Sequence, residues 1–181
     1  HALWRTLRAS DTDAVLALAQ RCLAVDGGHP EMAAACALAA CETDAARASQ
    51  GVFTPEGLAA YAAVLGGGDS AECHIQIDPA FRGRGLEGEM LDWSFKTAAQ
   101  LHCGHDGVTV VTEGLTEEAD RLYRAHGFVP VFAEDVMRLA LPAELPAVPM
   151  TAELTLVEWS ETEPEEFFQV YEAAFRERPG F

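Results

Sequence analysis

The order of apolar and polar residues along the chain predicts an α/β protein. Short apolar runs bounded by glycine, proline or acidic residues predict strands, which are 3–7, 52–54, 58–65, 72–77 and 108–112. After helix-capping residues at 10–13, apolar positions recur at helical spacing up to Leu23, and the glycines at 27 and 28 end that helix. The alanine-rich stretch 31–48 predicts a second helix. The hairpin 52–65 turns at 55–57.

The second half of the predicted domain continues the alternation of strands and helices. Leu86, Met90, Leu91 and Ala98 recur at helical spacing. Thr116 predicts the cap of a further helix that runs to 125, with acidic residues in its first turn. Two closing strands are predicted at 128–132 and 136–141. The predicted order is strand, two helices, three strands, helix, strand, helix and two strands.

Candidate chemistry gathers where the strand 72–77 passes into the next helix. Asp78 and Pro79 end the strand, and Gly83 and Gly85 allow the backbone to turn sharply and to approach a ligand. A helix N-terminus presents unpaired N–H groups and a positive partial charge, to which Arg82 and Arg84 would add two cations. This pattern favours binding of a diphosphate.

Two motifs resemble those of the GCN5-related N-acetyltransferase (GNAT) family. The run Arg82-Gly83-Arg84-Gly85-Leu86 is similar to the acyl-CoA turn of that family, Q/R-x-x-G-x-G/A. The second motif, A-x-x-L-Y-x-x-x-G-F, is matched by Ala119, Leu122, Tyr123, Gly127 and Phe128. Both occur in the family's order, with a helix and a strand between them.

The resemblance implies a fold, a co-substrate and a set of residues. The implied fold is a mixed, mostly antiparallel sheet that splays between its fourth and fifth strands, flanked by about four helices. Acetyl-CoA would lie in the splay, and the residues implied to hold it are Ile75, Ile77, Arg82, Gly83, Arg84, Gly85, Leu86, Glu87 and Gly88. Tyr123 matches the tyrosine that serves the family as general acid, although a tyrosine there can also be a packing residue.

The general base and any metal site are harder to identify from the sequence. Glu72 and His74 share one face of their strand, and Glu113 ends the next strand, so each is a candidate base or simply a solvated polar residue. His102, Cys103 and His105 lack a convincing fourth ligand, so no metal is expected.

Two residues depart from the family pattern. Glu87 stands where the motif ends in glycine or alanine, and Thr116 stands where asparagine is usual. Glu87 adds bulk and negative charge beside the diphosphate, although it also favours the helix dipole. Two hypotheses follow: an enzyme that transfers acetyl directly to a small amine, and a degenerate domain that binds CoA weakly or supports a catalytic C-terminal domain. Direct transfer is expected because no cysteine is recognisably placed as a nucleophile.

The C-terminal part of the chain differs in composition from the rest. Residues 1–141 are predicted as the GNAT-like domain, the proline-rich stretch 142–150 as a linker, and 151–181 as the start of a second such domain. Leu3, Asp11 and Leu16 recur as Leu154, Thr162 and Phe167, an offset of 151 residues. This repeat, with the segment 24–27, resembles tandem-domain acetyltransferases of the mycothiol synthase type. Alternatively, 151–181 packs onto a single domain.

Composition and charge limit the classes of partner that this chain is expected to bind. The chain has 181 residues and a net charge of −17, which argues against nucleic acid, and it has no apolar run of the roughly 18 residues that span a bilayer. An odd number of cysteines, five, favours reduced thiols and a cytoplasmic location. The expected partners are a small-molecule amine acceptor and either a C-terminal GNAT domain or a second copy of the chain.

Overall fold

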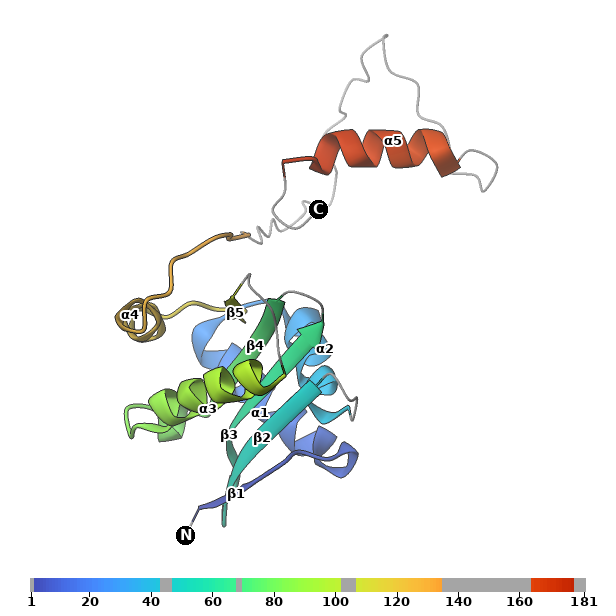
Figure 1. Cartoon of the computed structure of the whole chain (residues 1–181). Helices are drawn as coiled ribbons and strands as arrows, with labels where there is room; N and C mark the ends of the chain where they lie inside the picture. Colours follow the sequence, from blue (N-terminus) through green and yellow to red (C-terminus); the bar gives the residue numbers. More distant parts are fainter. Residues whose placement is uncertain (1, 43–46, 68–69, 102–106, 135–163, 178–181) are drawn as a thin grey trace, which may run out of the picture. The chain divides into compact units, whose positions relative to one another are not determined.

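The computed structural model describes residues 2–42, 47–67, 70–101, 107–134 and 164–177. Its contacts divide the chain into two compact units, His1–Phe128 and Val129–Phe181. The first unit holds the sheet and all but one of the described helices (Figure 1). The candidate site therefore lies in the first unit.

Five strands form one mixed sheet in the described part of the first unit. They are β1 (Leu3–Arg5), β2 (Arg47–Thr54), β3 (Gly57–Gly67), β4 (Ser70–Ile77) and β5 (Val108–Val111). The spatial order follows the chain, β1-β2-β3-β4-β5, and every pair is antiparallel except β4 with β5, which is parallel. A parallel pair needs a long crossover, and the helix between these strands supplies it. The predicted fold class is confirmed.

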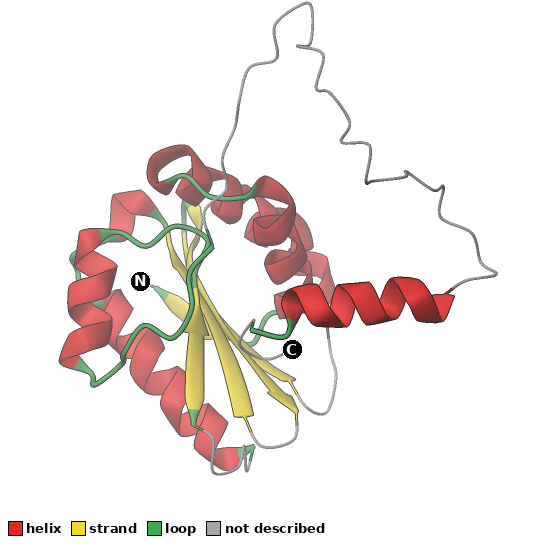
Figure 2. Cartoon of the chain, turned by 90° about the horizontal axis from the view of Figure 1, so that it is seen from above, coloured by secondary structure: helices red, strands yellow, loops and turns green. Residues whose placement is uncertain are grey.

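Helices cover both faces of this sheet (Figure 2). Helices α1 (Thr12–Asp26) and α2 (Pro30–Cys41) pack on one face, where their apolar side chains meet Tyr61 and Ala63 of β3. Helix α3 (Leu86–Gln100) packs on the other face. Because β3 is buried on both faces, it reads as a nearly unbroken apolar run. Helix α4 (Glu117–Ala125) follows β5.

The prediction for the second helix was too long. Helix α2 ends at Cys41, and the strand β2 begins at Arg47, inside the range 31–48 that was predicted as helical. Alanine favours helices, but Ala48 pairs with Val64 and Gln50 with Ala62 across the β2–β3 ladder. Pairing with β3 therefore outweighs local helix propensity there.

The prediction of a strand at 128–132 was wrong. Residues 128–134 form no regular element, and Val129, Val131 and Phe132 are exposed. Pro130 cannot donate to a strand ladder, which is one reason why this apolar run does not join the sheet. The predicted strand at 136–141 lies outside the described residues, as do the linker at 142–150 and the strand near Leu154.

The second unit contains one described helix, α5 (Pro164–Phe175). Shifted by 151 residues, α1 would fall on 163–177, so α5 lies where the internal repeat predicts a helix. The domain boundaries themselves remain a prediction. Among the described helices of both units, none combines the length and the apolar character needed to cross a membrane.

Candidate functional site

The turn between β4 and α3 has the backbone form that the sequence predicts. Gly83 and Gly85 have φ angles of +70° and +92°, a region that residues with a Cβ rarely adopt. A Cβ at either glycine would meet no atom within 4 Å, so the conformation, and not crowding within the chain, requires glycine there. Gly85 is the N-cap of α3, and the first N–H groups of that helix open onto this turn.

A carboxylate of the chain already contacts this turn. The Gly83 N–H donates to Glu87 Oε1 at 2.7 Å, an exposed hydrogen bond. Glu87 thus supplies an anionic oxygen to one of the N–H groups that the motif would present to a diphosphate. The departure from the family pattern at this position has a definite structural role.

Arg82 is paired inside the protein. Its guanidinium forms two parallel bonds with the Asp26 carboxylate, Nη1 to Oδ1 at 2.6 Å and Nη2 to Oδ2 at 2.5 Å. Its Nε donates to the Ile77 carbonyl at 3.2 Å. Arg84 lies differently, with its guanidinium 5.1 Å from the centre of the Phe81 ring. Of the two predicted cations, Arg82 is neutralised by Asp26 and Arg84 stays exposed.

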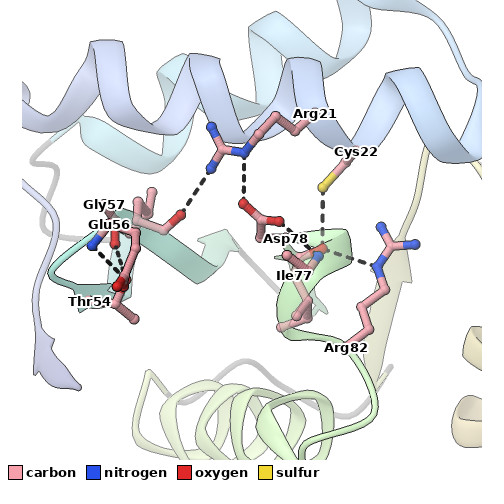
Figure 3. Close-up of polar contacts among 10 residues, drawn as sticks. Arg21, Cys22, Thr54, Glu56, Gly57, Ile77, Asp78 and Arg82 are labelled. Atoms are coloured by element: carbon pink, nitrogen blue, oxygen red, sulfur yellow. Dashed lines mark hydrogen bonds and ion pairs between the residues drawn. The ribbon is translucent and has the colours of Figure 1, made fainter. Parts of the chain in front are cut away.

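Helix α1 is fastened to the end of β4 by polar contacts (Figure 3). Arg21 Nε donates to Asp78 Oδ2 at 2.7 Å, and Cys22 Sγ donates to the Ile77 carbonyl at 3.4 Å. Asp78 is buried, and its other oxygen accepts from the Ala80 N–H at 2.9 Å. Together with the Asp26–Arg82 pair, these bonds fix where the turn begins.

The sheet divides directly before this turn. Strand β5 pairs with β4 only from Ala71 to His74, whereas β4 continues to Ile77. Within the described residues, the β5-facing edge of Ile75–Ile77 therefore has no strand partner. The Ile75 and Ile77 side chains pack with α3, so any role for them at this edge falls to their backbone groups.

Glu72 and His74 are brought together. His74 Nε2 lies 2.5 Å from Glu72 Oε1. Burial favours a lower pKa for His74, but the electrostatic influence of Cys36 and the hydrogen bond with Glu72 outweigh it and raise the pKa from 6.5 to about 9. The hydrogen bond to His74 lowers the pKa of Glu72 despite partial burial. At neutral pH His74 is thus protonated, which disfavours it as a general base and leaves Glu72 as an ionised acceptor.

Tyr123 lies on α4, whereas Glu72 and His74 lie on β4. Its ring meets Phe128 edge-on at 5.9 Å, and Phe128 stacks on Phe95 of α3 at 5.5 Å. Gly127, with φ +87°, lets the chain fold back so that the Phe128 N–H donates to the Tyr123 carbonyl at 3.0 Å. Burial raises the pKa of Tyr123, so its hydroxyl keeps its proton at neutral pH.

The remaining candidate residues have fewer contacts that point to a role in the site. Thr116 caps α4 by accepting from the Ala119 N–H at 3.2 Å, as the sequence predicts. Glu113 follows β5 and is half-buried. It lies against Gly28, because a Cβ added to Gly28 would lie 3.0 Å from the Cβ and from the carbonyl oxygen of Glu113. His102, Cys103 and His105 lie outside the described residues. Elsewhere in the described part of the chain, no group of three or more His, Cys, Asp or Glu is arranged to hold a metal ion.

Sequence reasoning missed Asp26 and Cys36. Asp26 belongs to the segment 24–27, which resembles tandem-domain acetyltransferases. Its partner Arg82 lies 56 residues away, however, and no local pattern connects the two. Cys36 lies in an alanine-rich helix, where a cysteine reads as a small packing residue. Only the fold brings it to His74.

Comparisons with solved structures decide the fold. A GCN5-related N-acetyltransferase from Sphaerobacter thermophilus is similar over 72% of this chain, with 27% identity and a TM-score of 0.60. This chain has the fold of the GCN5-related N-acetyltransferases. The match covers 44% of the Sphaerobacter protein, so the chain spans less than half of that protein's length.

Two further solved structures are similar to this chain in fold. One, from Clostridium acetobutylicum, is described as a "predicted acetyltransferase with acetyl-CoA"; it has 15% identity and a TM-score of 0.55, over 76% of this chain and 96% of that one. The other is the ribosomal-protein-S18-alanine N-acetyltransferase from Escherichia coli, with 17% identity and a TM-score of 0.54, over 73% and 80%. No family model matches the sequence, and no curated protein does.

The backbone of this turn is suited to a CoA diphosphate, whereas two nearby carboxylates disfavour one. The positive-φ glycines and the N-terminus of α3 form a cradle whose Cβ directions are open. Glu87 and Asp26, in contrast, already hold a donor N–H and a guanidinium. The Glu87 bond is exposed and worth about 0.5–1.5 kcal/mol, so an incoming diphosphate can displace it at modest cost.

Proposed function

We propose that this chain is an acetyl-CoA-dependent N-acetyltransferase that transfers the acetyl group directly to a small amine. The observation that carries the proposal is the turn at Gly83 and Gly85, which opens α3 directly after the point where β4 and β5 part. Fold alone does not determine activity, because one fold hosts many functions. The turn adds a specific feature suited to a diphosphate.

Each part of the site has a proposed role. The N–H groups from Gly83 to Gly88 would hold the diphosphate, with Arg84 as the exposed cation beside them. Backbone groups at Ile75–Ile77, other than the Ile77 carbonyl that already accepts from Arg82 and Cys22, would hydrogen-bond the pantetheine arm as an added strand does. Bound in this way, acetyl-CoA supplies an activated thioester.

Proton transfer would use Tyr123 and Glu72. Tyr123 keeps its proton because burial raises its pKa, so it can protonate the departing thiolate. Glu72 stays ionised beside His74 and can accept the proton of the attacking amine. His74 would then orient the Glu72 carboxylate without acting as the base.

A specific observation favours a second candidate function. Because Glu87 and Asp26 occupy the Gly83 N–H and Arg82, the domain could be a degenerate one that binds CoA weakly and supports a catalytic C-terminal domain. In the sequence repeat, α5 falls at the position that corresponds to α1, which motivates such a tandem partner, as in proteins of the mycothiol synthase type.

The two functions are separated by calorimetric titration with acetyl-CoA and by CoA release in the presence of a panel of amines. The enzyme hypothesis predicts binding and amine-dependent release of thiol. Gly85→Ala should weaken binding, since φ +92° strains a residue with a Cβ, whereas Gly107→Ala, which has the same φ but precedes β5 at the opposite end of the β4–β5 pair, should not. Binding without release would support the degenerate domain, and the absence of both would reject the enzyme.

A further inference from the structure

Strands β3 and β4 carry several polar side chains on the face of the sheet that α1 and α2 cover. Tyr61 of β3 is paired directly opposite Gln76 of β4, and Ala63 is paired opposite His74. Residues directly opposite each other share a face, and so do residues two apart on one strand. Tyr61 and Ala63 pack in one core cluster with residues of α1 and α2, which identifies that face. Glu72, His74, Gln76 and Tyr61 therefore all lie on it.

Tyr61 and Gln76 each carry a buried polar atom without a partner. The Tyr61 side chain is fully buried, and its hydroxyl makes no hydrogen bond within the described part of the chain. The Gln76 side chain is half-buried, but its Oε1 atom is buried and also has no hydrogen-bond partner among the described residues. Such atoms are rare in folded proteins, because each one lowers stability. Two of them at directly opposite strand positions indicate a site for a polar group.

The two atoms are complementary in their hydrogen-bonding character. The Tyr61 hydroxyl is a donor, because burial raises its pKa and it keeps its proton. Gln76 Oε1 is an acceptor. A hydroxyl group can accept from Tyr61 and donate to Gln76 at the same time, and a primary amide can do so through its C=O and NH2 groups. An ammonium group only donates, so it would leave the Tyr61 O–H without an acceptor.

Gln76 lies beside the open edge of the sheet. Strand β5 pairs with β4 only as far as His74, and Gln76 is the middle one of the three β4 residues that follow. The Glu72 carboxylate, which is the proposed base, reaches His74 and bonds its Nε2. Two residues of strand separate His74 from Gln76, a distance of about 7 Å. A substrate whose amine meets Glu72 would thus reach Gln76 with a polar group about 7 Å away.

We propose that Tyr61 and Gln76 bind a hydroxyl or carboxamide group of the amine acceptor, so the substrates of this chain are amines that carry such a group at their far end. This inference rests on the proposed function and specifies the substrate class of the same site. Glu72 would receive the proton of the amine, and the Tyr61–Gln76 pair would hold the other end of the molecule. Two fixed ends orient the nitrogen toward the thioester.

The test compares amines that differ only at the far end. Each amino alcohol of three to six carbons is paired with the n-alkylamine in which a methyl group replaces the hydroxyl, and CoA release from acetyl-CoA gives kcat/KM. We expect at least about a tenfold preference for the alcohol at four or five carbons, because the alkylamine leaves two buried polar atoms unpaired. Equal kcat/KM within every pair would overturn this inference and leave the acetyltransferase in place. If no amine released CoA, the proposed function would fail and this inference with it.

Variants assign the preference to the two residues. Tyr61→Phe and Gln76→Met should each reduce the ratio of alcohol to alkylamine kcat/KM by at least about fivefold, chiefly through a higher KM for the alcohol. The matched control is Gln50→Met, the same substitution at a half-buried residue of β2 on the other face of the sheet, where its partner Ala62 packs with α3. A ratio in both site variants that equals that of the control would overturn the proposal.

Thermal unfolding without substrate separates a binding role from a structural one. Removal of a buried hydroxyl that has no partner should leave the Tm of Tyr61→Phe equal to or above that of the wild type. The variant would then lose specificity without losing stability. A lower Tm together with an unchanged alcohol preference would show that the hydroxyl serves packing or a structural water only, and the proposal would be wrong.

Discussion

Two carboxylates, those of Glu87 and Asp26, take up groups that the turn after β4 would otherwise offer to a diphosphate. Their settings differ. The Glu87 bond is exposed, whereas the Arg82 side chain is held in a forked pair and also bonds the Ile77 carbonyl. Glu87 therefore acts as a weak competitor for the turn, and Asp26 acts as a fixed part of its framework.

Replacing Glu87 tests the competitor role. Glu87→Ala should tighten CoA binding by about tenfold or less, because an exposed hydrogen bond of about 0.5–1.5 kcal/mol no longer has to be broken. Calorimetry measures the change. The control is Glu89→Ala, which removes the same charge from the same helical turn, where Glu89 is exposed and does not contact Gly83. Equal affinities in wild type and Glu87→Ala would refute the competition.

Protonation of His74 should be visible in stability. The pKa of His74 is raised in the folded state from 6.5 to about 9, so the stabilisation is complete below about pH 6.5 and is lost as the pH rises to about 9. Urea unfolding should show the wild-type free energy falling over this interval by on the order of 1–3 kcal/mol. His74→Gln should not show this fall. A wild-type profile that is flat from pH 6.5 to 9 would contradict the pairing.

At the scale of elements, the end of α1 and the end of β4 form one unit. The residues that connect them lie on different elements, so the turn inherits its position from α1 as well as from the strand. The link runs through Arg21 and Asp78 and through Cys22 and the Ile77 carbonyl (Figure 3). It also runs through Asp26 and Arg82. Breaking one of these bonds should loosen the turn without unfolding the sheet.

Asp78→Asn tests this coupling. The amide can still accept from the Ala80 N–H but loses the charged bond with Arg21, which is about half-exposed, so we expect a loss of about 1 kcal/mol. Thermal unfolding and hydrogen exchange at 79–85 measure the effect. Asp92→Asn, an exposed site on α3, is the matched control. The coupling would be refuted if both variants exchanged like wild type.

At the scale of the whole molecule, the sequence predicted what depends on local pattern. The helix that starts after Gly85, the cap at Thr116 and the strand that ends at Ile77 were all readable, because capping residues, positive-φ glycines and apolar spacing act within a few residues. The extent of α2 was not readable, because pairing between β2 and β3 decided it.

Long-range partners in the candidate site were also beyond the sequence. Asp26 meets Arg82, and α2 covers the strand face that carries His74, only because α1 and α2 pack on the same side of the sheet. The Glu72–His74 pair is different, since strand alternation alone predicted that the two share a face. Which residue of that pair carries the proton depends on burial and on Cys36, and neither could be seen in the sequence.

The most direct test of the central claim is amide-resolved NMR during titration with CoA. The account predicts that the backbone N–H signals of Gly83, Gly85 and Leu86 shift progressively and saturate, and that the Gly83 signal shifts further because its bond to Glu87 is replaced. Signals from β1, which lies at the opposite edge of the sheet from β5, should stay in place. Saturating CoA that leaves the amides from 83 to 88 unmoved would contradict a diphosphate site at this turn.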